Sequence, residues 1–333
     1  MRTTGLLLFM MSCVFFGGCS LHPIPDDLST ENTFRIVNNI RCEVKDQVQL
    51  RLQELLDKSP DEAVRRFPLA NLNMLVREQG QAGILRILAS ADPTIAYKVL
   101  KYGSITIGYS FSFDITETNK NSANAGFRLP FTHTTFDLTA KGAANFTRQN
   151  VRTFAVSDSF LDLIALDCSG YRKRRGNFAY PIVGSIGVRN VIDTYLDLGK
   201  SGVTATEVAG IAGPFKDVIT FTTEISGDIS PTVTIAPVPN KFRLISAGGT
   251  FGAGRTDIHK LTILIPFPAL DDRPGSFLST ESFTAKEYTT AVENANKTIA
   301  YEFCIERAIN GTSGALPGIT TSPEQYCRDA SFR

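Results

Sequence analysis

The chain has 333 residues, with 34 lysines and arginines, 33 aspartates and glutamates, three histidines and no tryptophan. A chain of this length can bury one large core or two smaller ones. The near-neutral charge gives no sequence-wide electrostatic reason to bind nucleic acid, so no nucleic-acid partner is expected.

The N-terminal stretch Gly5–Ser20, GLLLFMMSCVFFGGCS, predicts where the protein resides. Arg2 precedes an apolar run over residues 6–16, which is too short to span a membrane because a span needs about 20 residues. Small residues then lead to Cys19. This order is typical of a secretory signal peptide, here residues 1–18.

Phe16-Gly17-Gly18-Cys19 resembles the lipobox of bacterial lipoproteins. The resemblance implies that the Cys19 thiol is acylated, that the signal is cut just before it, and that Ser20 directs the protein to the outer membrane. Several acyl chains anchor a protein firmly. We therefore expect an outer-membrane lipoprotein that faces the periplasm and contacts the membrane through its N-terminal lipid; the alternative is an ordinary cleaved signal. Residues 19–27 with the run FRIVNNIRCE also resemble uncharacterised proteobacterial lipoproteins, a likeness that implies no activity.

Four cysteines remain for pairing in an oxidising periplasm: Cys42, Cys168, Cys304 and Cys327. An even number suggests up to two disulfides, with three possible pairings. We prefer Cys304–Cys327, which would tie the C-terminal tail to the last helix, and Cys42–Cys168 by elimination. No Cys/His cluster suggests zinc, and we expect neither a metal nor a cofactor.

A proline-rich tether, residues 19–29, precedes the folded part, and its adjacent Asp26 and Asp27 are expected to diverge toward solvent. The helical spacing of apolar residues predicts a first helix that is capped by Ser29 or Thr30 and ends near residue 58. Shorter helices are predicted at 69–79, 82–89 and 93–102. Asp92 is the expected N-cap of the last one.

Alternation of apolar and polar residues predicts the strands. Residues 104–116 and 134–147 alternate in this way, with a polar, Asn-rich loop expected over 117–124. Further strands are predicted at 216–229, 232–237, 241–251 and 256–267. The Gly252-Ala253-Gly254 run is expected to form a tight turn between the last two strands.

Later helices are predicted at 157–167, 187–198 and 284–310. The basic run 172–175 between the first two is interpreted as a solvated loop, with an anionic-headgroup patch as the alternative. Together these elements predict an α+β fold, in which N-terminal helices precede a predominantly antiparallel sheet of about six strands packed with helices. We expect one domain over residues 30–333, with a possible boundary near Lys101.

Arg255, Asp257 and His259 alternate along one predicted strand and therefore share a face with apolar residues. They would form either a polar site, in which Asp257 orients His259 as a base and Arg255 holds an anion, or a structural ion pair and histidine at the end of the core. We favour the structural interpretation, because i and i+2 neighbours lie about 7 Å apart and only the long arginine can bridge that distance.

Three functions fit these features, and no catalytic residue is assigned. The favoured one is a non-catalytic, periplasm-facing lipoprotein that binds an envelope protein or polymer. The first alternative is a protomer of an oligomeric outer-membrane channel, because the longer predicted strands can span a bilayer when tilted. Against it, Tyr109, Phe111 and Phe113 lie mid-strand instead of forming aromatic girdles. The second alternative is a periplasmic hydrolase with its site around His259.

Overall fold

The computed structural model of the chain describes residues 23–67, 83, 87, 92–130, 135–171, 177–200, 207–208, 211–212, 214–234, 243–266, 283–311 and 327. Cys19, the helix predicted at 69–79, most of the helix predicted at 82–89 and the basic run 172–175 lie outside the described residues. The α+β class is confirmed, since helices accompany a mostly antiparallel sheet of five strands.

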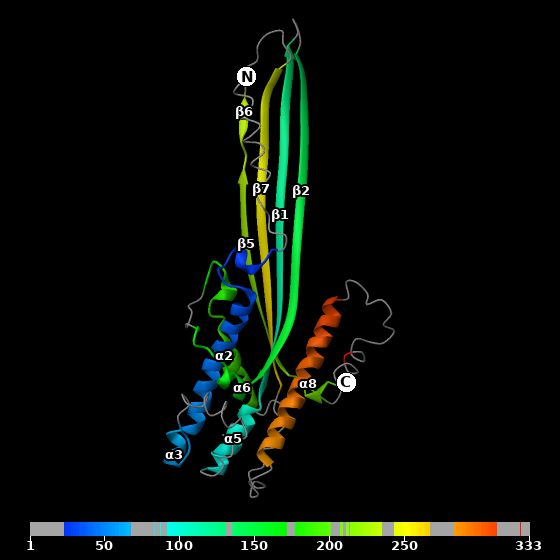
Figure 1. The fold of residues 1–333 in the computed structure, drawn as a ribbon. Coiled ribbons are helices and arrows are strands. Elements are labelled where there is room, and N and C mark those ends of the chain that lie inside the picture. The colour runs from blue at the N-terminus through cyan, green and yellow to red at the C-terminus, as the bar shows by residue number, and fades with distance from the viewer. Residues whose placement is uncertain are drawn as a thin grey trace. The chain divides into compact units, whose positions relative to one another are not determined.

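The main sheet has the strand order β2-β1-β7-β5, and the short strand β6 also pairs with β7 (Figure 1). A separate two-stranded sheet joins β3 to β4. The strands are β1 (Thr106–Pro130), β2 (Thr135–Ser159), β3 (Glu207–Val208), β4 (Ile211–Ala212), β5 (Phe215–Ile229), β6 (Thr232–Thr234) and β7 (Arg243–Ile265). The described helices are η1 (Pro25–Asp27), α2 (Thr33–Leu56), α3 (Glu62–Arg65), α5 (Pro93–Gly103), α6 (Phe160–Ala165), η2 (Pro181–Val183), α7 (Val188–Lys200) and α8 (Phe283–Gly311).

The chain divides into two compact units. The strand unit comprises the described residues within 1–28, 114–151 and 223–257, and the mixed unit comprises those within 29–113, 152–222 and 258–333. Four strands, β1, β2, β5 and β7, contribute residues to both units. The single domain expected over 30–333 stays a prediction.

The core of the mixed unit lies between α2 and one face of the sheet. An apolar stripe along α2 packs with α5, α6 and α7 against the first residues of β1, where Ile107, Tyr109, Phe111 and Phe113 are buried. The N-cap of α2 is Asn32, whose side chain accepts a hydrogen bond from the Arg35 amide at 2.9 Å. The expected caps Ser29 and Thr30 are wrong, because the Ser29 hydroxyl accepts from the amide of Glu31 in a local turn instead.

Helix α8 covers the other face of the sheet in the mixed unit. Ile299 and Phe303 pack with Leu264, whose side chain points away from those of Ile263 and Ile265 on the same strand. The helix approaches β1 closely at Gly108, where a Cβ would lie 2.4 Å from Ile299 Cγ2. Glycine is therefore required at that point by the closeness of the helix.

Three local features hold the mixed unit together. Asp92 caps α5 as predicted, because its carboxylate accepts from the amides of Thr94 and Ile95 at 3.1 Å. The Glu43 carboxylate of α2 accepts from three consecutive amides, residues 186–188, at the start of α7. Disulfides join Cys42 to Cys168 and Cys304 to Cys327, the two pairs preferred from the sequence.

Two segments that were expected to be a loop and a turn are strand. The Asn-rich segment 117–124 continues β1 to Pro130, and β7 passes without interruption through Gly252-Ala253-Gly254. Both expectations were wrong, because polar and small residues can occupy a strand when flanking strands pair with their backbone groups. The glycines of β7 make room for neighbouring side chains, since a Cβ on Gly252 would lie 2.3 Å from Asp228 Oδ1.

Strand β2 is also longer than expected. It continues to Ser159, and α6 begins at Phe160 instead of near residue 157. The Ser159 hydroxyl accepts from the amide of Asp162 at 3.1 Å and so fixes the start of the helix. Ser157, where the helix was expected to begin, therefore lies within the strand.

Candidate functional site

The structure brings two of the three predicted polar-site residues together. Arg255 and Asp257 form a two-point ion pair on β7, with Nε 2.8 Å from Oδ1 and Nη2 3.1 Å from Oδ2. The Asp257 side chain is fully buried and that of Arg255 is 9% exposed. This arrangement has the bidentate geometry of a strong guanidinium–carboxylate pair.

Three further groups, all in the strand unit, complete the Arg255 cluster. Nη1 lies 3.1 Å from Asp27 Oδ2 and 3.4 Å from Glu117 Oε1, and Nη2 donates to the Ile24 carbonyl oxygen at 2.8 Å. Burial lowers the pKa of Arg255, but the hydrogen bonds and charges of Asp257 and Asp27 outweigh it, so the net shift is upward. The guanidinium therefore stays charged and fully paired.

Sequence reasoning missed Asp27 and Glu117. Asp27 is exposed as expected, but its carboxylate also pairs with Arg255, and Glu117 was placed in a loop that is strand. The one available signal was the buried arginine itself, because a charge inside a sheet needs partners. Which segments supply those partners depends on the strand register, which the sequence does not give.

His259 has a different environment, in the mixed unit. It is 1% exposed, its Nε2 bonds the Tyr180 hydroxyl, and its ring meets that of Phe113 edge-on at 4.9 Å between centroids. A base needs contact with a substrate. These aromatic neighbours favour the structural interpretation of His259.

The strand unit has two chemically different faces. Arg255 contacts Glu117, and Arg128 forms an ion pair with Asp137 at 2.6 Å, so contacts across strands show which residues share a side. The side formed by the odd-numbered residues of β1, β5 and β7 and the even-numbered residues of β2 is called the apolar face. The opposite side is the polar face.

The apolar face also carries Arg148, which follows Phe146 on β2, and Arg243, the first residue of β7. Between the Arg255 cluster with Arg148 and this Arg243, the face has no charged residue among the described residues of the strand unit. We call this stretch the apolar zone; its only side chains with hydrogen-bonding groups are two asparagines. Its members are Asn119, Asn121, Ala123, Ala125, Phe127, Phe136, Leu138, Ala140, Gly142, Ala144, Phe146, Gly227, Ile229, Val233, Ala247, Gly249, Phe251 and Ala253. Large apolar side chains in it are exposed, with Phe136 at 52%, Phe146 at 58% and Ile229 at 72%.

The polar face along the same stretch is charged. Its ionisable residues are Lys120, Arg128, Asp137, Lys141 and Asp228. Within the described residues of the strand unit, Val151 is the one exposed large apolar residue on this face. Each strand thus alternates between polar and apolar side chains, and within the described residues of the strand unit the short turn η1 is the only helical element.

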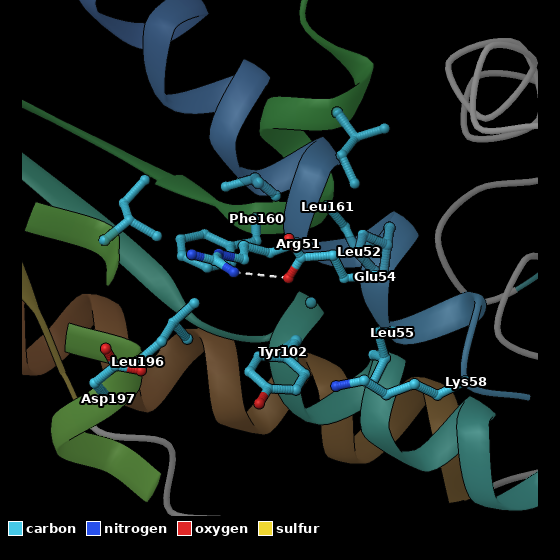
Figure 2. A pocket seen from close by; sticks show the side chains of 14 residues that line it. Arg51, Leu52, Glu54, Leu55, Lys58, Tyr102, Phe160, Leu161, Leu196 and Asp197 are labelled. Atoms are coloured by element: carbon cyan, nitrogen blue, oxygen red, sulfur yellow. Dashed lines mark hydrogen bonds and ion pairs between the residues drawn. The ribbon is translucent and has the colours of Figure 1, made fainter. Parts of the chain in front are cut away.

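A second candidate is a small cleft of about 80 Å³ in the mixed unit (Figure 2). Apolar side chains of α2, α6 and α7 form its walls. The cleft is also lined by Tyr102, Lys58 and Asp197. Arg51 is engaged, because it donates to Glu54 at 2.7 Å and to Asp193 at 3.1 Å. Its hydrogen bonds lower the pKa of the Asp193 carboxyl. The cleft therefore offers an apolar surface and no unpaired guanidinium.

Within the described residues, no group of three His, Cys, Asp or Glu side chains is arranged to hold a metal ion. None of the helices in the described ranges is both long enough and apolar enough to cross a membrane.

A family model described as "Uncharacterised protein y4kA" matches residues 22–308 of the chain. The chain is 29% identical over 291 residues to uncharacterized protein y4kA of Sinorhizobium fredii (strain NBRC 101917 / NGR234), covering 84% of this chain and 88% of that one.

Among solved structures, the chain is similar to one in the Klebsiella pneumoniae type II secretion outer-membrane complex of PulD, PulS and the PulC HR domain, with a TM-score of 0.29 and 8% identity. The match covers 74% of this chain and spans 50% of that one. This chain is also similar to the type II secretin GspD of E. coli K12, with a TM-score of 0.23 and 8% identity. That match covers 66% of this chain and 58% of the secretin chain.

Proposed function

The chain belongs to the y4kA family, and we propose that it is a lipid-anchored outer-membrane protein whose strand unit enters the bilayer as one protomer of an oligomeric channel. The main support for this proposal is the apolar zone, which is exposed and free of charge, whereas the opposite face of the same strands is charged. Strands that face lipid on one side and water on the other alternate in this manner.

The length of the apolar zone supports this proposal. On β2 it extends over residues 136–146, and on β1 over residues 119–127. A tilted strand needs about 9–11 residues to cross a bilayer. The aromatic residues Phe127 and Phe136 lie at one end of the zone and Phe146 at the other, whereas Tyr109, Phe111 and Phe113 belong to the core of the mixed unit. The objection based on those mid-strand residues therefore does not apply to the zone itself.

The two edges of the sheet are the surfaces through which copies of the chain would join into an oligomer. Contacts between the strands fit an antiparallel arrangement of neighbours, so β2 and β7 run in one direction and β1 and β5 in the other. If β2 of a second copy lies beside β5 and β6, the alternation continues with the apolar faces on one side. Such a head-to-tail contact closes into a ring when its rotation permits. The 25-residue edge strand β2 contains no proline to block this pairing.

A second candidate function is the non-catalytic, periplasm-facing component that binds an envelope protein or polymer. Exposed apolar surface also marks protein interfaces, and the apolar cleft of the mixed unit is a further surface for a partner. In this case a protein partner, and not lipid, covers the apolar zone. The hydrolase alternative stays a prediction that requires a loss of activity in a folded His259→Ala variant.

Two alanines of β2 provide a matched test. Ala140 lies in the middle of the apolar zone, and Ala143 lies on the polar face of the same strand. Arginine on the lipid face near the bilayer midplane costs about 2–4 kcal/mol. We expect Ala140→Arg to abolish dye efflux from vesicles that contain the acylated full chain, and Ala143→Arg to leave efflux near the wild-type level.

Three results would separate the candidates. Equal efflux from the two arginine variants contradicts insertion of the apolar zone. Absence of efflux from the wild type, together with release of a soluble monomer after Cys19→Ser, supports the periplasmic binding function. Covalent ladders of the wild type in crosslinked envelopes support the channel.

A further inference from the structure

Residues 23–27 of the tether are bound to the strand unit at several points. The Arg255 guanidinium bonds the Ile24 carbonyl oxygen and the Asp27 carboxylate, and the Asn150 side chain of β2 donates to the Pro23 carbonyl oxygen at 2.8 Å. Asp27 also accepts from the Ile24 amide at 2.8 Å, which closes the short turn η1. Side chains from two strands thus hold five consecutive residues.

Within the sheet itself, Arg255 is already paired with a residue of its own strand. Asp257 occupies Nε and one Nη2 hydrogen, and it is fully buried beneath the guanidinium. The outer donors point to the tether and to Glu117. A buried guanidinium left with unpaired donors is costly, so the tether completes a site that the strands only half satisfy.

This cluster lies on the apolar face at one end of the apolar zone. Arg255 follows Phe251 and Ala253 on the same side of β7, and Glu117 precedes Asn119 on the same side of β1. Cys19 is four residues before Pro23, and four residues reach at most about 14 Å in any conformation. The acyl chains of a lipidated Cys19 would therefore begin within this reach of the cluster.

We propose that Arg255, Asp257, Glu117 and Asn150 form a clamp for residues 23–27 that fixes where the N-terminal anchor leaves the apolar face. The biological role of the clamp rests on the proposed function, since it would keep the acyl chains beside the strands that enter the same leaflet. A short attachment raises the effective concentration of the strands at the bilayer surface. The clamp itself requires only the tether and the strand unit.

The test measures the distance between two spin labels in the acylated full chain in detergent micelles. Labels are placed through Asp26→Cys on the tether and Ser226→Cys on the exposed part of β5. We expect a narrow distance distribution in this background and a distribution at least twice as wide after Arg255→Met or Asp27→Asn. Asp27→Asn removes only the tether side of the clamp, so it remains informative if Arg255→Met fails to fold.

Arg128→Met is the matched control, because it breaks another ion pair of the strand unit, with Asp137, and leaves the clamp intact. The control should keep the narrow distribution. Unchanged widths in folded Asp27→Asn and Arg255→Met would overturn the clamp. Because detergent replaces the bilayer, this outcome is independent of vesicle efflux, so failure of the clamp and failure of the channel are distinguishable.

Discussion

The buried charges of this chain serve to hold segments in place. Arg255 joins two strands to the tether, and Glu43 joins α2 to the start of α7 through three backbone amides. In both cases one charged group satisfies several partners at once, which is the condition under which burying a charge is tolerated. His259 lies among aromatic rings, and its neighbours are those of a core residue.

One half-buried carboxyl on α8, that of Glu302, lacks this compensation. Burial raises the pKa of Glu302, the Lys216 ammonium lowers it and the Glu306 carboxylate, four residues along, raises it again, so the net shift is upward. Glu306 is better supported: burial raises its pKa, but Lys260, Lys216 and Thr262 together bring it below the ordinary value.

Glu302→Gln should therefore stabilise the protein near neutral pH. A carboxyl with a raised folded pKa binds its proton more tightly when folded, so its ionisation reduces stability as pH rises through that pKa. We expect a gain of about 0.2–0.5 kcal/mol at pH 7.5, the usual cost of like charges one helical turn apart. The gain should vanish below about pH 4, where the carboxyl is protonated in both states.

Thermal unfolding at the two pH values measures this effect. Glu293→Gln, at an exposed position on the same helix, serves as the control and should have no effect at either pH. A stabilisation by Glu302→Gln that persists unchanged in acid would show that the charge is not its cause.

At the scale of elements, close packing depends on particular glycines. A methyl group at Gly108 would collide with Ile299 and Phe303 of α8, whereas nothing lies within 4 Å of a Cβ at Gly142 of β2. The same substitution should therefore have opposite effects at the two positions.

We predict that Gly108→Ala costs about 1–3 kcal/mol, the usual range for overpacking a core. Gly142→Ala should instead add about 0.4–1 kcal/mol, because alanine restricts the unfolded chain without meeting an obstacle. Urea unfolding followed by circular dichroism compares the two variants. A loss at Gly142 as large as that at Gly108 would contradict the assigned packing of α8 on β1.

The elements with a single apolar face and clear caps could be predicted from the sequence. Helix α5 begins after Asp92 as expected, and the apolar alternation from Ile105 to Ile115 marks the buried part of β1. The polar half of β1 could not be predicted, because Asn and Lys residues at 117–124 favour a loop unless neighbouring strands pair with them. Gly252 and Gly254 were assigned to a turn for a similar reason. Side chains of other strands leave no room for a Cβ at these positions, and the sequence does not show which strands are neighbours.

The candidate site was predicted only in part. Arg255 and Asp257 could be placed on one face by counting along the strand, and their direct bond fits the length of arginine. Asp27 and Ile24 could not be assigned, because the tether lies 228 residues away from Arg255 along the chain. The alternation of Phe136, Leu138 and Phe146 was visible in the sequence, but their exposure was not.

For the whole molecule, the central claim is that one face of the strand unit contacts lipid. The mixed unit has a conventional core, with helices on both sides of its part of the sheet. The apolar zone in the strand unit has no comparable cover among the described residues. We propose that a membrane covers the apolar zone and that an acylated Cys19 would insert into the same membrane.

Because the sequence contains no tryptophan, a single introduced tryptophan reports on one position alone. The most direct measurement is quenching by brominated lipids of tryptophans placed singly along β2, with Leu138→Trp on the apolar face and Thr139→Trp on the polar face as the first pair. We predict severalfold stronger quenching at 138 than at 139, and a period of two over residues 136–147. Equal quenching at neighbouring positions, or none at any position in vesicles that contain the acylated protein, would contradict insertion of the apolar face.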